Sequence, residues 1–269
     1  DAIAYAEWGI DYIKYDWCDT KGLNSAGAYT TMRDAIRSAG RPMLFSICEW
    51  GDTRPWEWAK DVGHSWRTTG DIYPCWNCEF SQGSFSAWGV LRILDKQSGL
   101  RQHAGPGHWN DMDMLVVGKG LSEDEDKSHF SAWAMLASPL ILGNDVRSMP
   151  AATHRILTNA GAIAINQDKL GVSAWRFLQA GDIEYWAKPL AGDEWALMVM
   201  NRGAQAAPVS FDWGAYHIND DLSKRTADFK KKPYAWTDVW TGKTGDTTRK
   251  LEAKVPSHGT LLLRLKLKT

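Results

Sequence analysis

The stretch DYIKYDWCDTKGLNSAGAYTTMRDAIRSAGRPMLFSIC, residues 11–48, predicts one β–α–β unit. Residues 11–16 form a short apolar run typical of a strand, and residues 25–39 have a helical pattern that Gly40 ends. Residues 43–48 predict the next strand. Because a helix connects the two strands, we expect them to be parallel and covered on one face by that helix.

The same alternation continues toward the middle of the chain. Further expected elements are a short helix over 55–62, strands over 64–69, 114–117 and 140–142, helices over 84–97, 122–137 and 150–159, and an apolar tail over 162–165. Ser122 and Glu125 have the spacing of a capping box that opens the helix expected over 122–137. The sequence thus predicts about five β/α units, whereas a closed barrel has eight. We expect three further units to precede Asp1.

The pattern changes after residue 171. Short apolar runs with partial alternation, separated by Gly, Pro, Asn or Asp, occupy residues 175–178, 183–187, 195–200, 208–211, 235–240 and 261–267. These runs predict an antiparallel all-β sandwich over residues 172–269. Residues 1–171 would then be a catalytic domain of the α/β class, a partial (β/α)8-type barrel.

Composition excludes several classes of function. The 269 residues include 31 Lys and Arg against 32 Asp and Glu, a net charge of −1, so no polycationic surface for nucleic acid is expected. The longest apolar run, over 132–143, is far short of the about 20 residues that span a bilayer. The 16 Trp residues suit both core filling and the apolar faces of sugar rings.

Acidic and aromatic side chains gather where the predicted strands end. They are Asp16, Glu49, Trp50, Asp71, Asp111 and Asp113. Two carboxylates that face one barrel mouth are the minimum equipment for glycoside hydrolysis, one ionised and one protonated. Lys14 lies two residues before Asp16, on the same strand face, and would keep that carboxylate ionised. The alternative is that these strand-end Asp residues only cap helices or pair with Lys.

Residues 105–114 combine a glycine-rich turn, Trp109 and two acidic residues within ten positions. Asp111 and Asp113 have the Asp-x-Asp spacing that can ligate calcium. The run lacks the glycine and the bidentate Glu of a calcium loop, so no metal site is expected there.

Five motifs occur in a characteristic order along the chain. They are YIKYDWC over 12–18, CEWG over 48–51, WRTTGD over 66–71, WNDMDML over 109–115 and AINQD over 164–168. In this the chain resembles the retaining α-galactosidases of glycoside hydrolase family 27, clan D. The resemblance implies an eight-fold β/α barrel followed by an antiparallel β domain, with no cofactor.

The resemblance also implies roles for individual residues. Asp16 matches the nucleophile and Asp71 the general acid/base, and retention requires their carboxyl groups to lie roughly 5–6 Å apart. The positions that match the lining of the galactose pocket are Lys14, Cys48, Glu49, Trp50, Arg67 and Asp113. The implied partner is a carbohydrate, an α-galactoside, and the implied assembly is a monomer or homodimer in an exported compartment.

Specificity depends on one of these positions. Glu49 matches the residue that contacts the sugar's 2-hydroxyl, where the sister α-N-acetylgalactosaminidases have a small side chain. A carboxylate there favours galactose. The family fold also serves β-L-arabinopyranosides and isomalto-linked glucosides, and a non-catalytic sugar-binding chain is the alternative outside the enzyme class.

The four cysteines fall into two groups. Cys18 matches a half-cystine of the family whose partner would precede Asp1. Cys75 and Cys78 lie outside the family pattern, and their spacing predicts a small loop disulfide.

Overall fold

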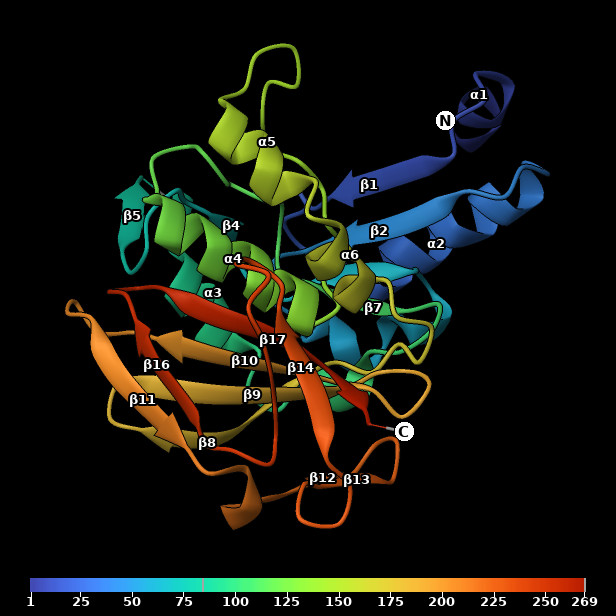
Figure 1. Ribbon diagram of the computed structural model, residues 1–269. Helices are drawn as coiled ribbons and strands as arrows, with labels where there is room; N and C mark the ends of the chain where they lie inside the picture. The colour runs from blue at the N-terminus through green and yellow to red at the C-terminus, as the bar shows by residue number, and fades with distance from the viewer. Residues whose placement is uncertain (84, 269) are drawn as a thin grey trace.

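The computed structural model describes residues 1–83 and 85–268. Its first half is built on a four-stranded parallel sheet in the order β1-β2-β3-β7 (Figure 1). The strands are β1 (Tyr12–Asp16), β2 (Leu44–Cys48), β3 (Ser65–Arg67) and β7 (Trp109–Asp111). The parallel β/α architecture predicted from the sequence is therefore confirmed, and all four strands end at the same edge.

Helix α2 (Ser25–Ser38) connects β1 to β2, after the short helix α1 (Ala2–Glu7). The Asn24 side chain caps α2 by accepting a hydrogen bond from the Gly27 N–H. Tyr29, Met32 and Ile36 of α2 are buried in one cluster with Phe45 and Ile47 of β2. This is the helix-on-sheet packing that the alternation of the sequence predicts.

The short helix expected over 55–62 is instead two 3-10 turns, η1 (Pro55–Glu57) and η2 (Ala59–Asp61). Arg54 precedes the first turn in the left-handed region, at φ 57°, and Trp58 between the turns has φ −125°. Neither conformation propagates an α-helix, which explains why the prediction of a helix was wrong.

The helix expected over 84–97 is also shorter than predicted. Helix α3 (Val90–Lys96) begins only after Gly89, because Phe85–Trp88 form strand β6. That strand lies between β4 (Asp71–Ile72) and β5 (Glu79–Gln82) in a small sheet of order β4-β6-β5. The disulfide expected between Cys75 and Cys78 closes the loop between β4 and β5.

Strands were expected over 114–117 and 140–142, and this prediction was wrong. The structure has a single parallel bridge between Leu115 and Leu142, and the fourth strand is β7. Leu115, Val116 and Val117 are buried in the main core, so their apolar character reflects packing rather than sheet pairing.

The helices of the second part of this region largely follow the sequence. The 3-10 turn η3 (Arg101–His103) precedes β7, and α4 (Glu123–Met135), α5 (Ala151–Leu157) and α6 (Ala160–Asn166) follow it. The capping box of Ser122 and Glu125 is present at the start of α4, as predicted. The expected apolar tail over 162–165 lies within α6, which Asn159 caps through the Ala162 N–H.

The C-terminal region is the expected antiparallel sandwich. Its main sheet has six strands in the order β15-β14-β17-β10-β9-β8, and two further two-stranded pairs are β11-β16 and β12-β13. The elements are β8 (Trp175–Ala180), β9 (Ile183–Pro189), β10 (Trp195–Asn201), β11 (Ala207–Phe211), η4 (Trp213–Ala215), β12 (His217–Asp220), β13 (Arg225–Asp228), β14 (Tyr234–Asp238), β15 (Thr244–Asp246), β16 (Leu251–Val255) and β17 (Thr260–Leu267).

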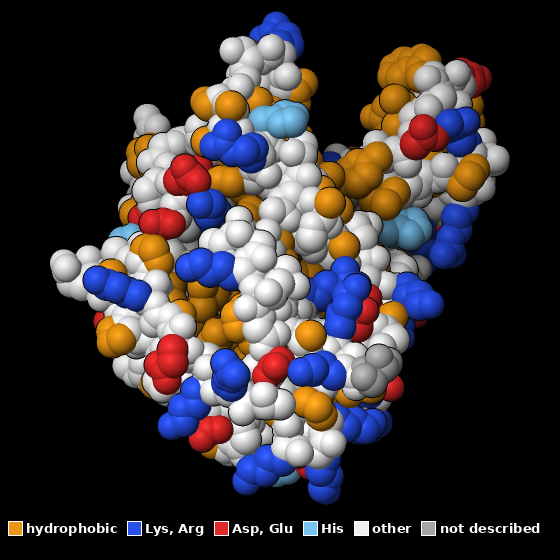
Figure 2. All heavy atoms as spheres, viewed as in Figure 1, with side chains coloured by type: hydrophobic (Ala, Val, Ile, Leu, Met, Phe, Trp, Pro, Cys, Tyr) orange, Lys and Arg blue, Asp and Glu red, His pale blue; other side chains and the backbone are white. Residues whose placement is uncertain are grey.

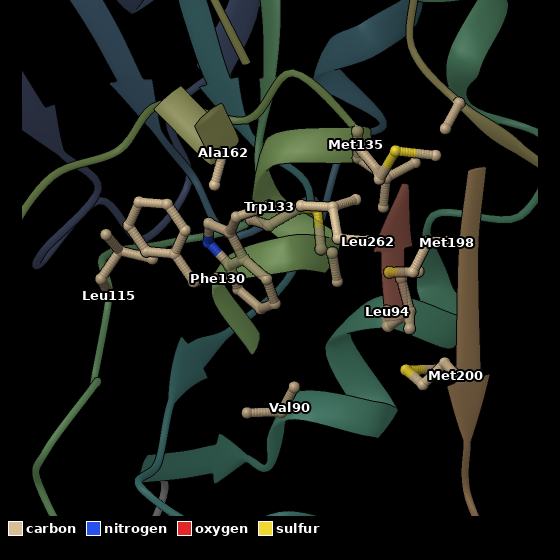
Figure 3. Close-up of a cluster of buried hydrophobic side chains, with 14 of the residues drawn as sticks. Val90, Leu94, Leu115, Phe130, Trp133, Met135, Ala162, Met198, Met200 and Leu262 are labelled. Carbon is tan, nitrogen blue, oxygen red and sulfur yellow. The ribbon is translucent and has the colours of Figure 1, made fainter. Parts of the chain in front are cut away.

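The two regions share one hydrophobic core. Trp133 and Met135 of α4 are buried in one cluster with Met198 and Met200 of β10 and Leu262 of β17 (Figure 3). Each such side chain contributes about 1.5–3 kcal/mol when it is fully buried. Helix α4 therefore fixes the sandwich against the β/α region.

Apolar burial is uneven across the molecule. Every residue of β9 and β10 is buried, whereas Tyr12 and Tyr15 of β1 are 39% and 40% exposed. Figure 2 shows hydrophobic side chains on the walls of a hollow beside the α1–β1 arm. Among the helices of the described residues, none has both the length and the apolar character needed to cross a membrane.

Candidate active site

The candidate site lies at the carboxyl edge, defined here as the ends of β1, β2, β3 and β7. The strand register places Asp16 of β1 level with Cys48 of β2, and Arg67 of β3 level with Asp111 of β7. Because the strands are parallel, these chemically active side chains end at one edge of the sheet. Catalytic sites of β/α folds are built at this edge.

Asp16 is an exposed carboxylate with several stabilising neighbours. The Trp17 N–H donates to its Oδ1 at 2.9 Å, and the thiols of Cys48 and Cys18 donate to the same carboxylate. Partial burial raises the pKa of Asp16, but these hydrogen bonds and the Lys14 charge outweigh that effect and hold the pKa below its usual value. Asp16 is therefore ionised at neutral pH, as a nucleophile must be.

Arg67 connects the second carboxylate to the rest of the edge. Its side chain is 1% exposed, and its Nη2 lies 3.2 Å from Asp71 Oδ1 and 2.9 Å from Asp113 Oδ2. Burial disfavours the Arg67 charge, but the neighbouring Asp113, Asp111 and Asp71 outweigh it and raise its pKa. Arg67 Nη1 lies 3.9 Å from the Cys48 sulfur, so the buried cation also contacts the end of β2, next to the strand that carries Asp16.

Asp113 is the buried counterpart of this cation. Its Oδ2 also accepts from the Ile72 N–H at 2.8 Å, and its Oδ1 lies 3.8 Å from Lys14 Nζ. Asp113 has φ 79°, a conformation that a residue other than glycine adopts only when its surroundings impose it. The Trp133 indole N–H donates to the Asp113 carbonyl at 2.7 Å, which ties the site to α4.

Glu49 and Trp50 form the turn after β2. Glu49 is fully buried, and its carboxylate accepts from the Thr53 N–H and hydroxyl, each at 2.7 Å, and from the Gly51 N–H at 3.1 Å. Burial raises the pKa of Glu49, against these hydrogen bonds. Trp50 has φ 58°, and a Cβ at Gly51 would lie 2.5 Å from the Thr68 carbonyl oxygen. The turn thus requires both a strained residue and a glycine.

The sequence-predicted residues therefore lie along the carboxyl edge and its adjoining turns. Direct contacts link Cys48 to Arg67 and Arg67 to both Asp71 and Asp113, with Lys14 next to Asp113, while Cys48 is level with Asp16 on the neighbouring strand and lowers its pKa. Glu49 and Trp50 are placed by the turn that follows Cys48. The roughly 5–6 Å between the carboxyl groups of Asp16 and Asp71 stays a prediction.

Two participants were not predicted for the site. Cys18 was expected only as a half-cystine, yet its exposed thiol donates to Asp16, which raises the pKa of Cys18. The Asp-x-Cys spacing was the available signal, since it places the two side chains close together. Asp111 was expected as a strand-end acid and a possible calcium ligand, without a role in binding the sugar; burial raises its pKa while Arg67 opposes that shift.

The contacts of Asp111 and Asp113 differ from those of calcium ligands. The Asp113 N–H donates to Asp111 Oδ1 at 2.8 Å, while Arg67 and Lys14 neutralise Asp113. Within residues 1–83 and 85–268, no group of three His, Cys, Asp or Glu side chains is arranged to hold a metal ion.

Comparisons with known proteins all match one family. A family model described as Alpha galactosidase A matches residues 1–168, and one described as Alpha galactosidase C-terminal beta sandwich domain matches residues 180–265. Alpha-galactosidase A of Cellvibrio japonicus (strain Ueda107) is 59% identical over 265 residues, covering 98% of this chain and 66% of that protein. The chain thus spans about two thirds of the length of this curated relative.

Solved structures with the same fold include alpha-galactosidase I from Mortierella vinacea. Its TM-score is 0.88 at 34% identity, over 98% of this chain and 70% of that one. The alpha-galactosidase of Saccharomyces cerevisiae with raffinose has a TM-score of 0.89 at 28% identity, over 100% of this chain and 75% of that one.

Proposed function

The chain belongs to the alpha galactosidase A family, and on that premise we propose that it hydrolyses terminal α-D-galactosyl residues with retention of configuration. The observation that carries this proposal is the arrangement at the carboxyl edge. Asp16 is held ionised by Trp17, two thiols and Lys14, while Asp71 is held by a buried guanidinium that also contacts Cys48. Two carboxylates at one edge of the sheet supply the pair of groups that a retaining glycosidase needs.

The proposed mechanism is a double displacement. Asp16 attacks the anomeric carbon as Asp71 protonates the departing glycosidic oxygen, which leaves a β-linked galactosyl ester on Asp16. Asp71 then accepts a proton from water, and that water attacks the ester from the α face. Galactose leaves with its α configuration retained, and Asp16 returns to its ionised form. Protons and bonds balance without a cofactor.

We propose that the remaining residues of the edge bind the galactose ring. Lys14 and Arg67 donate to sugar hydroxyls, Asp113 accepts from them, and the Trp50 ring faces the sugar. Cys48 holds the Asp16 carboxylate in position. Together the proposed binding set is Lys14, Cys48, Glu49, Trp50, Arg67 and Asp113.

Glu49 is the proposed determinant of the group at C2. Its buried carboxylate accepts a hydrogen bond from the Gly51 N–H, so the turn holds a bulky acidic side chain where an acetamido group would require a small one. Raffinose, the sugar in the yeast relative's structure, is an α-galactoside of the class expected here. The alternatives are β-L-arabinopyranosides, α-N-acetylgalactosaminides or isomalto-linked glucosides, and a panel of aryl glycosides distinguishes them.

We further propose a catalytic unit over 1–171, a sandwich domain over 172–269, and an exported protein that is a monomer or homodimer. The Cys75–Cys78 disulfide favours an oxidising compartment.

Hydrolysis of an aryl α-D-galactoside, with Asp16→Asn as the control, tests the proposed activity. We expect the chain to release the phenol and the variant to lose at least about 10⁴-fold in kcat, while galactose binding survives. On the acid side, turnover by the chain should persist to a lower pH than an ordinary aspartate would allow, because the pKa of Asp16 lies below its usual value. Equal turnover by the variant, or none by the unaltered chain, would contradict the proposal.

A further inference from the structure

Three aromatic side chains that the mechanism does not use lie on the small sheet after Asp71. The rings of Tyr73 and Phe80 are stacked, with centroids 4.9 Å apart and an interplanar angle of 3°. The Phe85 ring lies 6.3 Å from that of Phe80. Tyr73 and Phe85 are 38% and 46% exposed, so these rings form a surface rather than a core. We call Tyr73, Phe80 and Phe85 the aromatic platform.

Strand register places the aromatic platform on the same sheet face as Asp71. Ala87 of β6 is level with Asp71 on one side and with Phe80 on the other, and level residues on neighbouring strands point to one face. Tyr73 and Phe85 each lie two residues from a member of this row, which is the repeat of a strand face. In Figure 1 the arrows of β1 and β2 point toward the side where β4 and β5 lie.

The platform is held rigidly. The Cys75–Cys78 disulfide closes the loop beneath it, and a Cβ at Gly89 would lie 2.8 Å from the Cys75 sulfur, so the loop packs directly on the start of α3. An exposed ion pair between Arg92 and Glu79 also links β5 to α3. A preorganised aromatic surface binds a ligand without a further loss of conformational entropy.

We propose that Tyr73, Phe80 and Phe85 bind the leaving-group sugar, the pyranose joined to galactose through the scissile oxygen. This inference rests on the proposed function, because Asp71 must protonate that oxygen and the leaving group therefore lies on the Asp71 side. A pyranose with equatorial hydroxyls, such as glucose, presents an apolar C–H face that packs on aromatic rings. The platform thus favours the binding of oligosaccharides with a terminal galactose over the binding of galactose itself.

Binding to the inactive Asp16→Asn variant, measured by calorimetry with galactose and with raffinose, tests the aromatic platform. We expect raffinose to bind more tightly than galactose, and Tyr73→Ala to weaken raffinose binding about 3- to 10-fold with galactose binding unchanged. Tyr73→Phe should retain the raffinose affinity, because the ring and not the hydroxyl makes the contact. Trp8→Ala is the matched control, since Trp8 is an exposed aromatic residue after α1.

The outcomes separate the two proposals. Raffinose binding that Tyr73→Ala and Phe85→Ala leave unchanged, or a loss that affects galactose equally, would overturn the platform. Hydrolysis of α-galactosyl fluoride by the unaltered chain is measured in parallel, because its leaving group is not a sugar. Failure of that hydrolysis defeats the proposed function, whereas a normal rate there with unselective sugar binding defeats the platform alone.

Discussion

The carboxyl edge of the parallel sheet and the interface of α4 with the sandwich both bury charged side chains, and they differ in what those charges contact. At the edge, buried Arg67 contacts Asp71, whose side chain is 43% exposed. At the interface, fully buried Lys188 of β9 donates to the Ala134 carbonyl of α4 at 2.9 Å. In the proposed mechanism the buried Arg67 charge positions a catalytic carboxylate, whereas the Lys188 ammonium joins β9 to the backbone of α4.

This contrast separates two kinds of substitution. A change at the carboxyl edge should alter turnover first, and a change at the α4 interface should alter stability first. The predictions below test that separation, beginning with the largest expected effect.

Asp71→Ala should lower kcat/KM for raffinose by about 10²–10⁴-fold, because general acid catalysis is lost. The loss for α-galactosyl fluoride should be much smaller, since fluoride leaves without a sugar-oxygen protonation step. The melting temperature should change little, because Asp113 still neutralises Arg67. Equal losses on the two substrates would show that Asp71 is not the acid.

Arg67→Met should lower both turnover and stability, because it leaves Asp113 buried beside a neutral side chain. Removing one partner of a buried ion pair costs about 3–5 kcal/mol. Urea unfolding measures this loss. Arg147→Met is the matched control, since the Arg147–Asp145 pair is exposed and such a pair contributes little to stability. Similar losses in the two variants would contradict the role given to Arg67.

Lys188→Met should change the pH dependence of stability without changing kcat/KM. Burial lowers the pKa of Lys188 to about 7. Between that value and its ordinary pKa of about 10.4, the unfolded chain binds a proton that the folded chain does not, so the free energy of unfolding rises with pH. Lys188→Met should reduce that rise by up to about 1.4 kcal/mol per pH unit. Parallel pH profiles for the two proteins would exclude this account of Lys188.

Ser122→Ala should give the smallest effect, a loss of about 1 kcal/mol in the free energy of unfolding. The Ser122 side chain accepts from the Glu125 N–H, and the Glu125 carboxylate accepts from the Ser122 N–H. Ser38→Ala, at an exposed position near the end of α2, should be close to neutral. We expect kcat/KM of Ser122→Ala to be unchanged, so that the substitution alters stability alone.

Local patterns predicted the parts of the fold that depend on neighbouring residues. The first three parallel strands, helix α2 and the capping box of α4 are of this kind, because periodicity and caps act within a few positions. The helix expected over 84–97 failed at Trp88, which pairs with Ile72 across the small sheet. Strands β12, β13, β15 and β16 of the sandwich were not predicted, because they are short and partly exposed.

The site was predicted as a set of strand-end residues but not as a network. Asp16, Asp71 and Asp113 could be found from their positions after apolar runs and from the family motifs. The contacts of Arg67 with Asp71 and Asp113 depend on how β3, β4 and the segment after β7 approach one another. No spacing within one segment determines that approach, so the bridging cation became visible only in the structure.

The anomeric configuration of the product formed in azide tests the central claim most directly. Asp16→Gly and Asp71→Gly are each incubated with α-galactosyl fluoride and azide, and the galactosyl azide is identified by proton NMR. If Asp16 is the nucleophile, azide replaces it and Asp16→Gly yields the β-azide. In Asp71→Gly azide attacks the galactosyl ester on Asp16 and yields the α-azide. The same anomer from both variants, or the reverse assignment, would contradict the roles given to the two carboxylates.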